Sequence, residues 1–150
     1  MKVLFGEYLD ERNYFEEAAF MFMAANALEQ SQESFLKALN VEMTLAVGQQ
    51  RNLSAEEMTK LREELVDRLK SAIRFEDAGD LIDPQADFEG AFDCYVRANT
   101  FQKAIKVCTE TKNLEKITSV IKPALLIALD LKANQLRSVI DVFGKRILRL

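Results

Sequence analysis

"FEEAAFMFMAAN", from Phe15 to Asn26, returns later in the chain as "FEGAFDCYVRAN", from Phe88 to Asn99. The two stretches share Phe, Glu, Ala, Ala and Asn at matching places, and "RFEDAGDLI" from Arg74 is a third, partial copy. Each copy carries a small residue, Ala18, Ala78 or Ala91, that lets one helix approach another closely. Aromatic and small residues in this order are typical of stacked helical hairpins, here with an irregular period.

Helical periodicity extends over nearly the whole chain, and no segment has the alternation of a strand. Ser54 and Glu57 have the spacing of a capping box, and a stripe of apolar residues follows at intervals of three or four: Met58, Leu61, Leu65, Leu69 and Ile73. Breaks are expected at Asn26, Asn40, Asn52, Asp83-Pro84 and Asn99. The predicted helices span residues 2–11, 14–25, 29–39, 41–50, 54–74, 75–82, 87–98, 100–111 and 113–121, with a last helix through 134–150. The predicted fold is therefore all-α, a tetratricopeptide-like solenoid (α-α superhelix) with a long C-terminal helix, forming one module over 1–150.

Pro123 interrupts the apolar stretch "LEKITSVIKPALLIALDL" of Leu114–Leu131. Proline lacks an N–H and is tolerated in a first helical turn, so we expect the helix from Leu114 to end near Ile121 and Pro123 to open the next one. A kinked continuous helix is the alternative. Three charged residues, Lys116, Lys122 and Asp130, argue against a membrane span.

The last helix presents an apolar stripe that needs a partner. Its members, the candidate protein-interaction face, are Leu136, Ile140, Phe143, Ile147 and Leu150. The stripe packs either on the helix that starts at Pro123 or, if left uncovered, on another chain. The same segment is basic, with a net charge of +4 over residues 131–150 in a chain of −4. We interpret this charge as a solvated helix face, with Lys145, Arg146 and Arg149 as candidates for a weak tRNA contact.

The composition argues against catalysis. The chain has no histidine, only two cysteines (Cys94 and Cys108) and no Gly-rich phosphate loop. Neighbouring acids such as Glu63 and Glu64 point about 100° apart on a helix, so they do not converge on a substrate atom. We predict buried, reduced cysteines, no cofactor, no metal and no small-molecule ligand. The aromatic residues could form a stacking platform, but their helical spacing favours a core: Phe15, Phe20, Phe22, Phe88, Phe92 and Tyr95.

Five segments occur in an order that resembles one family: "YFEEAAFMFMAAN", "ESFLKALNVEMTLAVGQQRNLSAEEMTKL", "RFEDAGDLI", "DFEGAFDCYVRANTFQKAIKVC" and "IKPALLIAL". Together they resemble the helical-repeat region of the largest subunit of Elongator, a scaffold in which two WD40 propellers precede a tetratricopeptide-like solenoid. The chain departs from the family pattern in "KALNVEMTL", where Leu39 stands for Gly, Val41 for Trp and Thr44 for Ala.

This resemblance implies a non-catalytic scaffold segment of a larger protein in a cytoplasmic complex, with the nucleus as a second location. The complex modifies wobble uridines of tRNA through a separate catalytic subunit. The implied partners are that subunit and a second copy of the scaffold, which dimerises through a part downstream of a region like this one. Two other readings stay open, a scaffold of a vesicle coat or of intraflagellar transport, and nucleic-acid binding through the basic last helix.

Overall fold

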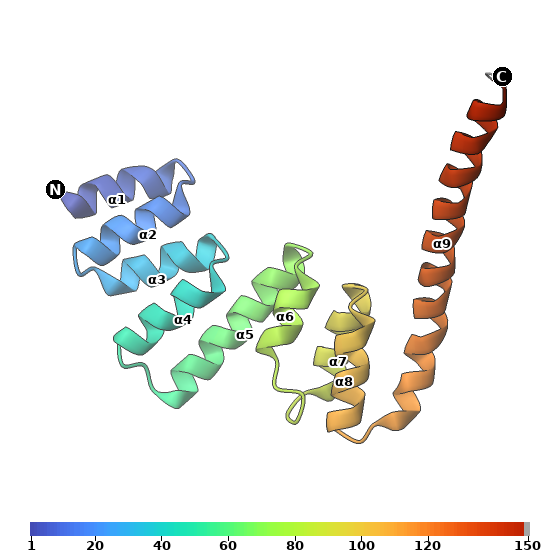
Figure 1. Cartoon of the computed structure of the whole chain (residues 1–150). Coiled ribbons are helices and arrows are strands. Elements are labelled where there is room, and N and C mark those ends of the chain that lie inside the picture. The colour runs from blue at the N-terminus through green and yellow to red at the C-terminus, as the bar shows by residue number, and fades with distance from the viewer. Residues whose placement is uncertain (149–150) are drawn as a thin grey trace. The chain divides into compact units, whose positions relative to one another are not determined.

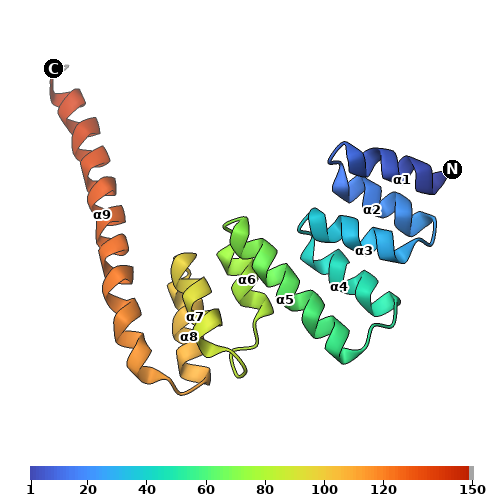
Figure 2. The same cartoon turned by 180° about the vertical axis from the view of Figure 1, so that it is seen from behind.

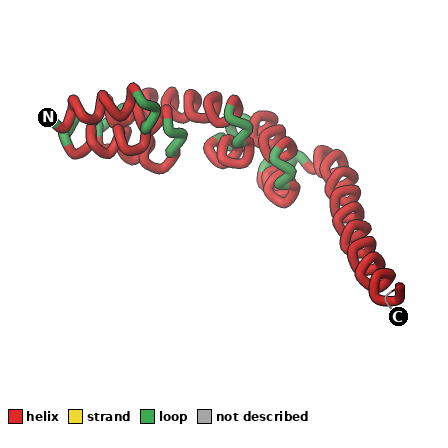
Figure 3. The backbone as a smooth tube through the Cα atoms, turned by 90° about the horizontal axis from the view of Figure 1, so that it is seen from above, coloured by secondary structure: helices red, strands yellow, loops and turns green. Residues whose placement is uncertain are grey.

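The computed structural model describes residues 1–148, except for the side chains of Leu136, Val139 and residues 142–148. This part of the chain is all-α, as predicted, and contains no strand (Figure 3). Its helices follow one another as hairpins (Figure 1). They are α1 (Lys2–Glu11), α2 (Phe15–Ala24), α3 (Leu28–Lys37), α4 (Val41–Gln50), α5 (Ala55–Ser71), α6 (Phe75–Leu81), α7 (Phe88–Arg97), α8 (Phe101–Glu110), the 3-10 turn η1 (Leu114–Lys116) and α9 (Ile117–Leu148). Two compact units divide the chain, Met1–Ile82 and Asp83–Leu150.

The turns between helices, apart from the loop between α6 and α7, repeat one backbone arrangement. At the end of α5, the N–H of Arg74 donates to the carbonyl of Leu69, and the N–H of Ile73 donates to that of Lys70. These two bonds form a Schellman motif, which needs a left-handed residue just after the helix. Among residues 1–148, seven residues in such turns have positive φ: Asn13, Asn26, Leu39, Asn52, Ile73, Asn99 and Lys112. At six of these seven turns, the next helix begins directly after the residue that follows the left-handed one; the turn at Asn52 is the exception. Such short connections hold consecutive helices close together.

In the first unit, consecutive helices from α1 to α6 pack on one another. Ala19, Phe35 and Val47, from α2, α3 and α4, form a buried cluster flanked by Met23, Leu28 and Met43. Ala18 and Ala19 are fully buried, so the small side chains of the first repeat copy do sit at close contacts. The Ser31 hydroxyl donates to the Ala19 carbonyl at 2.9 Å, which satisfies a polar group inside this contact.

The long helix of the first unit, α5, begins at the predicted capping box. Ser54 and Glu57 exchange two hydrogen bonds, and Leu61, Leu65 and Leu69 are buried. The predicted stripe was wrong at Ile73, because α5 ends at Ser71 and Ile73 lies in the left-handed turn with 77% of its surface exposed.

In the second unit, α7 and α8 form a hairpin, and α9 packs on α8. Ala91 and Cys94 from α7, Ala104 and Cys108 from α8, and Val120 from α9 are buried. The amine of Lys116 pairs with the Glu89 carboxylate at 3.0 Å, which joins η1 to α7. In Figure 2, α9 extends well beyond the end of α8.

The prediction of a helix end near Ile121 was wrong, because α9 runs without interruption through Pro123. Pro123 removes one backbone hydrogen bond, to the carbonyl of Ser119, but the rest of the helix continues on both sides. Of the alternative, a kinked continuous helix, the continuity is thus confirmed. The last helix cannot pack on a helix that starts at Pro123, since both are the same helix.

Candidate protein-interaction surfaces

The predicted interaction face lies mostly outside the described side chains. Ile140 is described and is 66% exposed, which fits a face without cover. The side chains of Leu136, Phe143, Ile147, Lys145 and Arg146 lie outside the described part, as do residues 149 and 150 (Arg149 and Leu150) altogether. The interaction face and the tRNA contact at these positions therefore stay predictions.

The structure exposes a second apolar surface on α9, closer to its start, which the sequence analysis missed. Ile121, Leu125 and Leu129 are four residues apart and therefore share one side of the helix, with 44%, 58% and 63% exposed. We call these three residues the α9 stripe. Part of it, with Thr118, Lys122 and Leu126, lines a shallow apolar hollow.

The opposite side of α9 is also apolar. Val120 is buried, whereas Ile127 and Leu131 along the same side are 41% and 60% exposed. A helix segment that is apolar all round is normally enclosed by other helices. The apolar run "ALLIALDL" does indicate this surface. The sequence analysis missed it because a helix break at Pro123 would have made this run part of a separate helix that packs on the last one.

A third apolar surface lies on α1. Met1, Leu4, Phe5 and Tyr8 are exposed on the side away from α2, and we call them the α1 face. The Phe5 and Tyr8 rings stack with centroids 6.2 Å apart, and the Arg12 guanidinium lies 4.5 Å from the Tyr8 ring centre. The opposite side of α1 holds Gly6, which is buried against Phe22 of α2.

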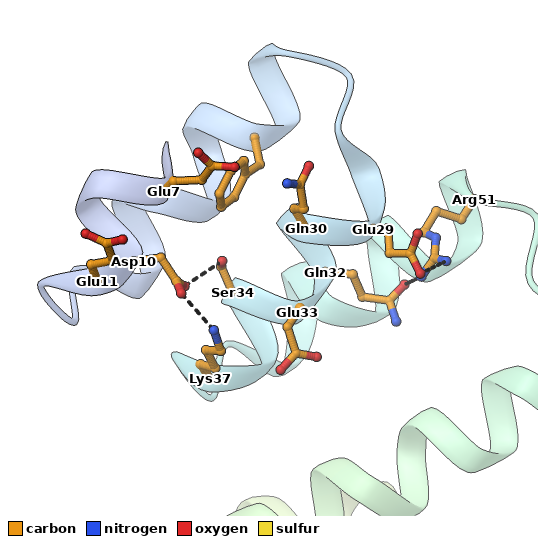
Figure 4. A pocket seen from close by; sticks show the side chains of 11 residues that line it. Glu7, Asp10, Glu11, Glu29, Gln30, Gln32, Glu33, Ser34, Lys37 and Arg51 are labelled. Carbon is orange, nitrogen blue, oxygen red and sulfur yellow. Dashed lines mark hydrogen bonds and ion pairs between the residues drawn. The ribbon is translucent and has the colours of Figure 1, made fainter. Parts of the chain in front are cut away.

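An acidic hollow of about 610 Å³ opens beside α1 and α3 (Figure 4). Its lining has five carboxylates and two cations: Glu7, Asp10, Glu11, Glu29, Glu33, Lys37 and Arg51. Asp10 accepts hydrogen bonds from the Ser34 hydroxyl at 3.0 Å and the Lys37 amine at 2.8 Å, and Arg51 donates to Gln32 at 2.8 Å. Because both cations are already paired with other side chains of the lining, the hollow favours binding of a positively charged group.

The comparison with known families gives one match, to the ELP1 TPR domain, over residues 2–115. This match covers more than half of the chain and takes in the helices from α1 to α8. The chain belongs to the ELP1 TPR domain family. No curated protein matches the sequence.

Membership in the ELP1 TPR family identifies the chain as the tetratricopeptide region of the largest Elongator subunit, which is a scaffold region. The acidic hollow and the α1 face, apart from Met1, lie inside the matched residues, and the α9 stripe lies beyond them. None of the helices in the described part is both long and apolar enough to cross a bilayer.

Of the six aromatic residues predicted as core, Phe15 and Phe88 are partly buried and Phe20 is exposed, so the prediction holds only for the other three. Phe22, Phe92 and Tyr95 are buried, and the half-exposed Phe20 meets the Phe35 ring edge-on with centroids 5.0 Å apart. Both cysteines are buried and neither forms a disulfide, and burial raises the pKa of the Cys108 thiol. Among the described residues, no group of His, Cys, Asp or Glu side chains is placed to hold a metal ion.

Proposed function

We propose that the chain is a non-catalytic scaffold segment that holds Elongator subunits in place while wobble uridines of tRNA are modified. The observation that carries this proposal is the family match across residues 2–115. The modification chemistry is assigned to a separate catalytic subunit. The match favours this role over a scaffold of a vesicle coat or of intraflagellar transport.

The acidic hollow supports a role in binding a partner subunit. A stacked helical array offers an extended surface, because each hairpin contacts only its neighbours. The five carboxylates of the hollow would suit a Lys- or Arg-containing segment of the catalytic subunit. A second copy of the scaffold would join through other parts of the larger protein. We place the complex in the cytoplasm, with the nucleus as a second location.

A direct contact with tRNA would be weak in this segment. Residues 1–82 contain nine Lys and Arg against sixteen Asp and Glu, a net charge of −7 that repels phosphate. Residues 83–150 contain eleven against eight, a net charge of +3. Any tRNA contact would therefore come from the second unit.

The test places variants in the source gene and measures carbonylmethyl-type side chains on wobble uridines of total tRNA by mass spectrometry. Glu7→Gln, Glu11→Gln and Glu33→Gln together remove three charges from the hollow without changing its shape. We expect fewer modified uridines and less catalytic subunit recovered with the scaffold. The matched control, Glu17→Gln, Glu42→Gln and Glu63→Gln, removes three exposed charges from outside the hollow lining.

Deletion of the whole segment tests the scaffold role independently of partner binding in the hollow. If deletion of residues 2–115 leaves modification unchanged while the shortened protein is still made, the scaffold role is wrong. If deletion abolishes modification but the hollow variant behaves like its control, the partner binds another surface. Recovery of coat or transport subunits with the full protein would support the alternative scaffold.

A further inference from the structure

A second hollow of the first unit, of about 420 Å³, lies between the ends of α3 and α5, and we call it the serine hollow. Its lining combines two cations with one hydroxyl: Lys37, Leu39, Asp67, Arg68, Ser71 and Ala72. Ser71 follows Arg68 by three residues, so their side chains share one side of α5. The hollow thus holds an exposed hydroxyl together with two positive charges.

Both cations of the serine hollow pair with carboxylates of the acidic hollow. The Lys37 amine, which lines both hollows, lies 2.8 Å from the Asp10 carboxylate. The Arg68 guanidinium lies 3.9 Å from Glu33, and 2.8 Å from Glu64 on its own helix. A strong anion in the serine hollow would therefore compete with Asp10 and Glu33 for the same two cations.

The end of α5 is accessible to another protein. Residues 71–74 are all exposed, and the Ser71 hydroxyl donates to the Asp67 carbonyl within its own helix at 2.9 Å. Ile73 has a φ of 62°, where a β-branched side chain is strained. Opening of this turn uncovers no buried side chain among these four residues and relieves the strain at Ile73, so the free energy that it costs is low.

The residues around Ser71 have the charge pattern that basophilic protein kinases select. Arg68 and Lys70 lie three residues and one residue before it, and none of the four residues after it is acidic. Kinases of this class bind such cations with acidic groups of their substrate cleft. Ser54 also follows an arginine by three residues, but two glutamates come directly after and its hydroxyl belongs to the capping box. Thr100, which follows an arginine in the same way, is partly buried.

We propose that Ser71 is a phosphorylation site for a basophilic protein kinase, and that its phosphate pairs with Lys37 and Arg68 in the serine hollow. The Ser71 Oγ attacks the γ-phosphorus of ATP, the bond to the ADP oxygen breaks, and the hydroxyl proton passes to a base of the kinase. The phosphate brings a charge of about −1.5 to −2 and three acceptor oxygens. It draws both cations away from Asp10 and Glu33, which leaves more unpaired negative charge in the acidic hollow.

The modification itself goes beyond the proposed function, whereas its effect on the acidic hollow rests on that function. A hollow with fewer paired carboxylates binds a Lys- or Arg-containing segment more tightly. Phosphorylation of Ser71 would thus regulate how firmly the scaffold holds its partner subunit.

The first test incubates the folded chain with ATP and cyclic-AMP-dependent protein kinase, a basophilic kinase, and locates the phosphate by mass spectrometry. We expect one phosphate per chain, on Ser71. Arg68→Gln should slow the reaction about tenfold, because the kinase loses one charge-assisted contact. The control Arg62→Gln removes an exposed charge elsewhere on α5 and should not slow it. Phosphate on other residues only, or phosphorylation of a peptide of residues 65–77 but not of the folded chain, would overturn the proposal.

Phosphorus NMR of the modified chain tests the contact with the two cations. Neighbouring cations lower the second pKa of a phosphate below its ordinary value of about 6. We expect a lower phosphate pKa in the folded chain than in the same chain unfolded by urea. Lys37→Gln, outside the kinase motif, should raise this pKa, whereas the exposed control Lys60→Gln should not. Equal pKa values in the folded and unfolded chains would contradict the pairing.

Calorimetry with an octa-arginine peptide tests the effect on the acidic hollow. We expect phosphorylation to tighten binding severalfold in the unaltered chain, and to change it little in the Glu7→Gln, Glu11→Gln and Glu33→Gln variant. No gain, or an equal gain in both chains, would overturn the regulation. Such a result would leave the scaffold role intact, because that role is tested by the modification of tRNA.

Discussion

Gly6 of α1 lies directly against the ring of Phe22 in α2. A Cβ atom at position 6 would stand 2.7 Å from Cε1 of Phe22, closer than two carbon atoms can approach without one of them moving. The glycine therefore sets the distance between the first two helices. It keeps the α1 face on the outer side, where Leu4 and Tyr8 are exposed.

Gly6→Ala should lower the free energy of unfolding by about 1–3 kcal/mol, because the new methyl group overpacks against a rigid ring. Urea denaturation measures the change. Gly48→Ala is the control in another helix, where the Cβ would meet the Met58 and Leu61 side chains at 3.0 and 3.1 Å, a looser contact than the 2.7 Å at Gly6. There the better helix propensity of alanine should offset the contact. Equal losses at both sites would show that Phe22 is not the obstacle.

Ile73→Gly should raise the free energy of unfolding by about 1 kcal/mol. Ile73 has a φ of 62°, where a β-branched residue is strained and glycine is not. Since the side chain is mostly exposed, little burial is lost. Asn52→Gly, at the same place in another turn with a φ of 55°, should change stability by only a few tenths of a kcal/mol. A loss of stability for Ile73→Gly would contradict the strained turn.

Ala91→Arg should destabilise the second unit by about 3 kcal/mol or more, because Ala91 is fully buried in α7 and a charged side chain has no room there. A drop in melting temperature, followed by circular dichroism, measures the effect. The same change at the exposed Ala86 should leave the melting temperature nearly unaltered. If both variants have the same melting temperature, the alignment of the repeat copies on Ala18 and Ala91 is wrong.

Glu57 should make stability depend on pH. Hydrogen bonds from the Ser54 backbone and then its side chain lower the pKa of Glu57 below its ordinary value of 4.5. A carboxylate with a lowered pKa stabilises the folded state above the unfolded pKa, and this stability is lost as pH falls through the folded pKa. Stability curves of the unaltered chain and Glu57→Gln should therefore differ at pH 7 and converge in acid. Ser54→Ala should reduce the difference, and a constant gap at all pH values would contradict the cap.

Pro123→Ala should stabilise α9, because alanine supplies the missing N–H to the Ser119 carbonyl and removes the clash of the ring. We expect a gain of about 1–3 kcal/mol, seen as slower amide hydrogen exchange along the helix. Pro84→Ala, in the loop before α7, is the control and should bring no gain. An unchanged rate of amide hydrogen exchange in α9 would mean that Pro123 does not destabilise the helix.

The helices and most of their ends could be predicted from the sequence, because periodicity and asparagine mark them. Asn26, Asn52 and Asn99 adopt the left-handed conformation that asparagine tolerates. Leu39 and Ile73 adopt it as well, yet leucine and isoleucine carry no turn signal, so packing of the flanking helices must impose it. Leu39 stands where the resemblance implies glycine, and its φ of 56° explains why glycine suits that position.

Surfaces were harder to predict than helices. Leu125 and Leu129 read as core residues in the sequence, because exposure depends on which helix lies next to them and not on residue type. The acidic hollow likewise joins Glu7 and Glu33, which are far apart in the sequence, and only the hairpin packing brings them together. We expected a helix to end just before Pro123 because proline lacks a backbone N–H. The helix continues on both sides of the proline, so the rest of α9 compensates for this one missing hydrogen bond.

The order of packing in this chain also bears on how it forms. Helices that contact one another strongly are consecutive in the sequence, so most contacts close short loops. Such a chain should fold quickly, hairpin by hairpin, and its first hairpins need no later residues to do so. During synthesis on the ribosome, α1 and α2 can therefore pair before the residues of α3 and of the later helices have been made.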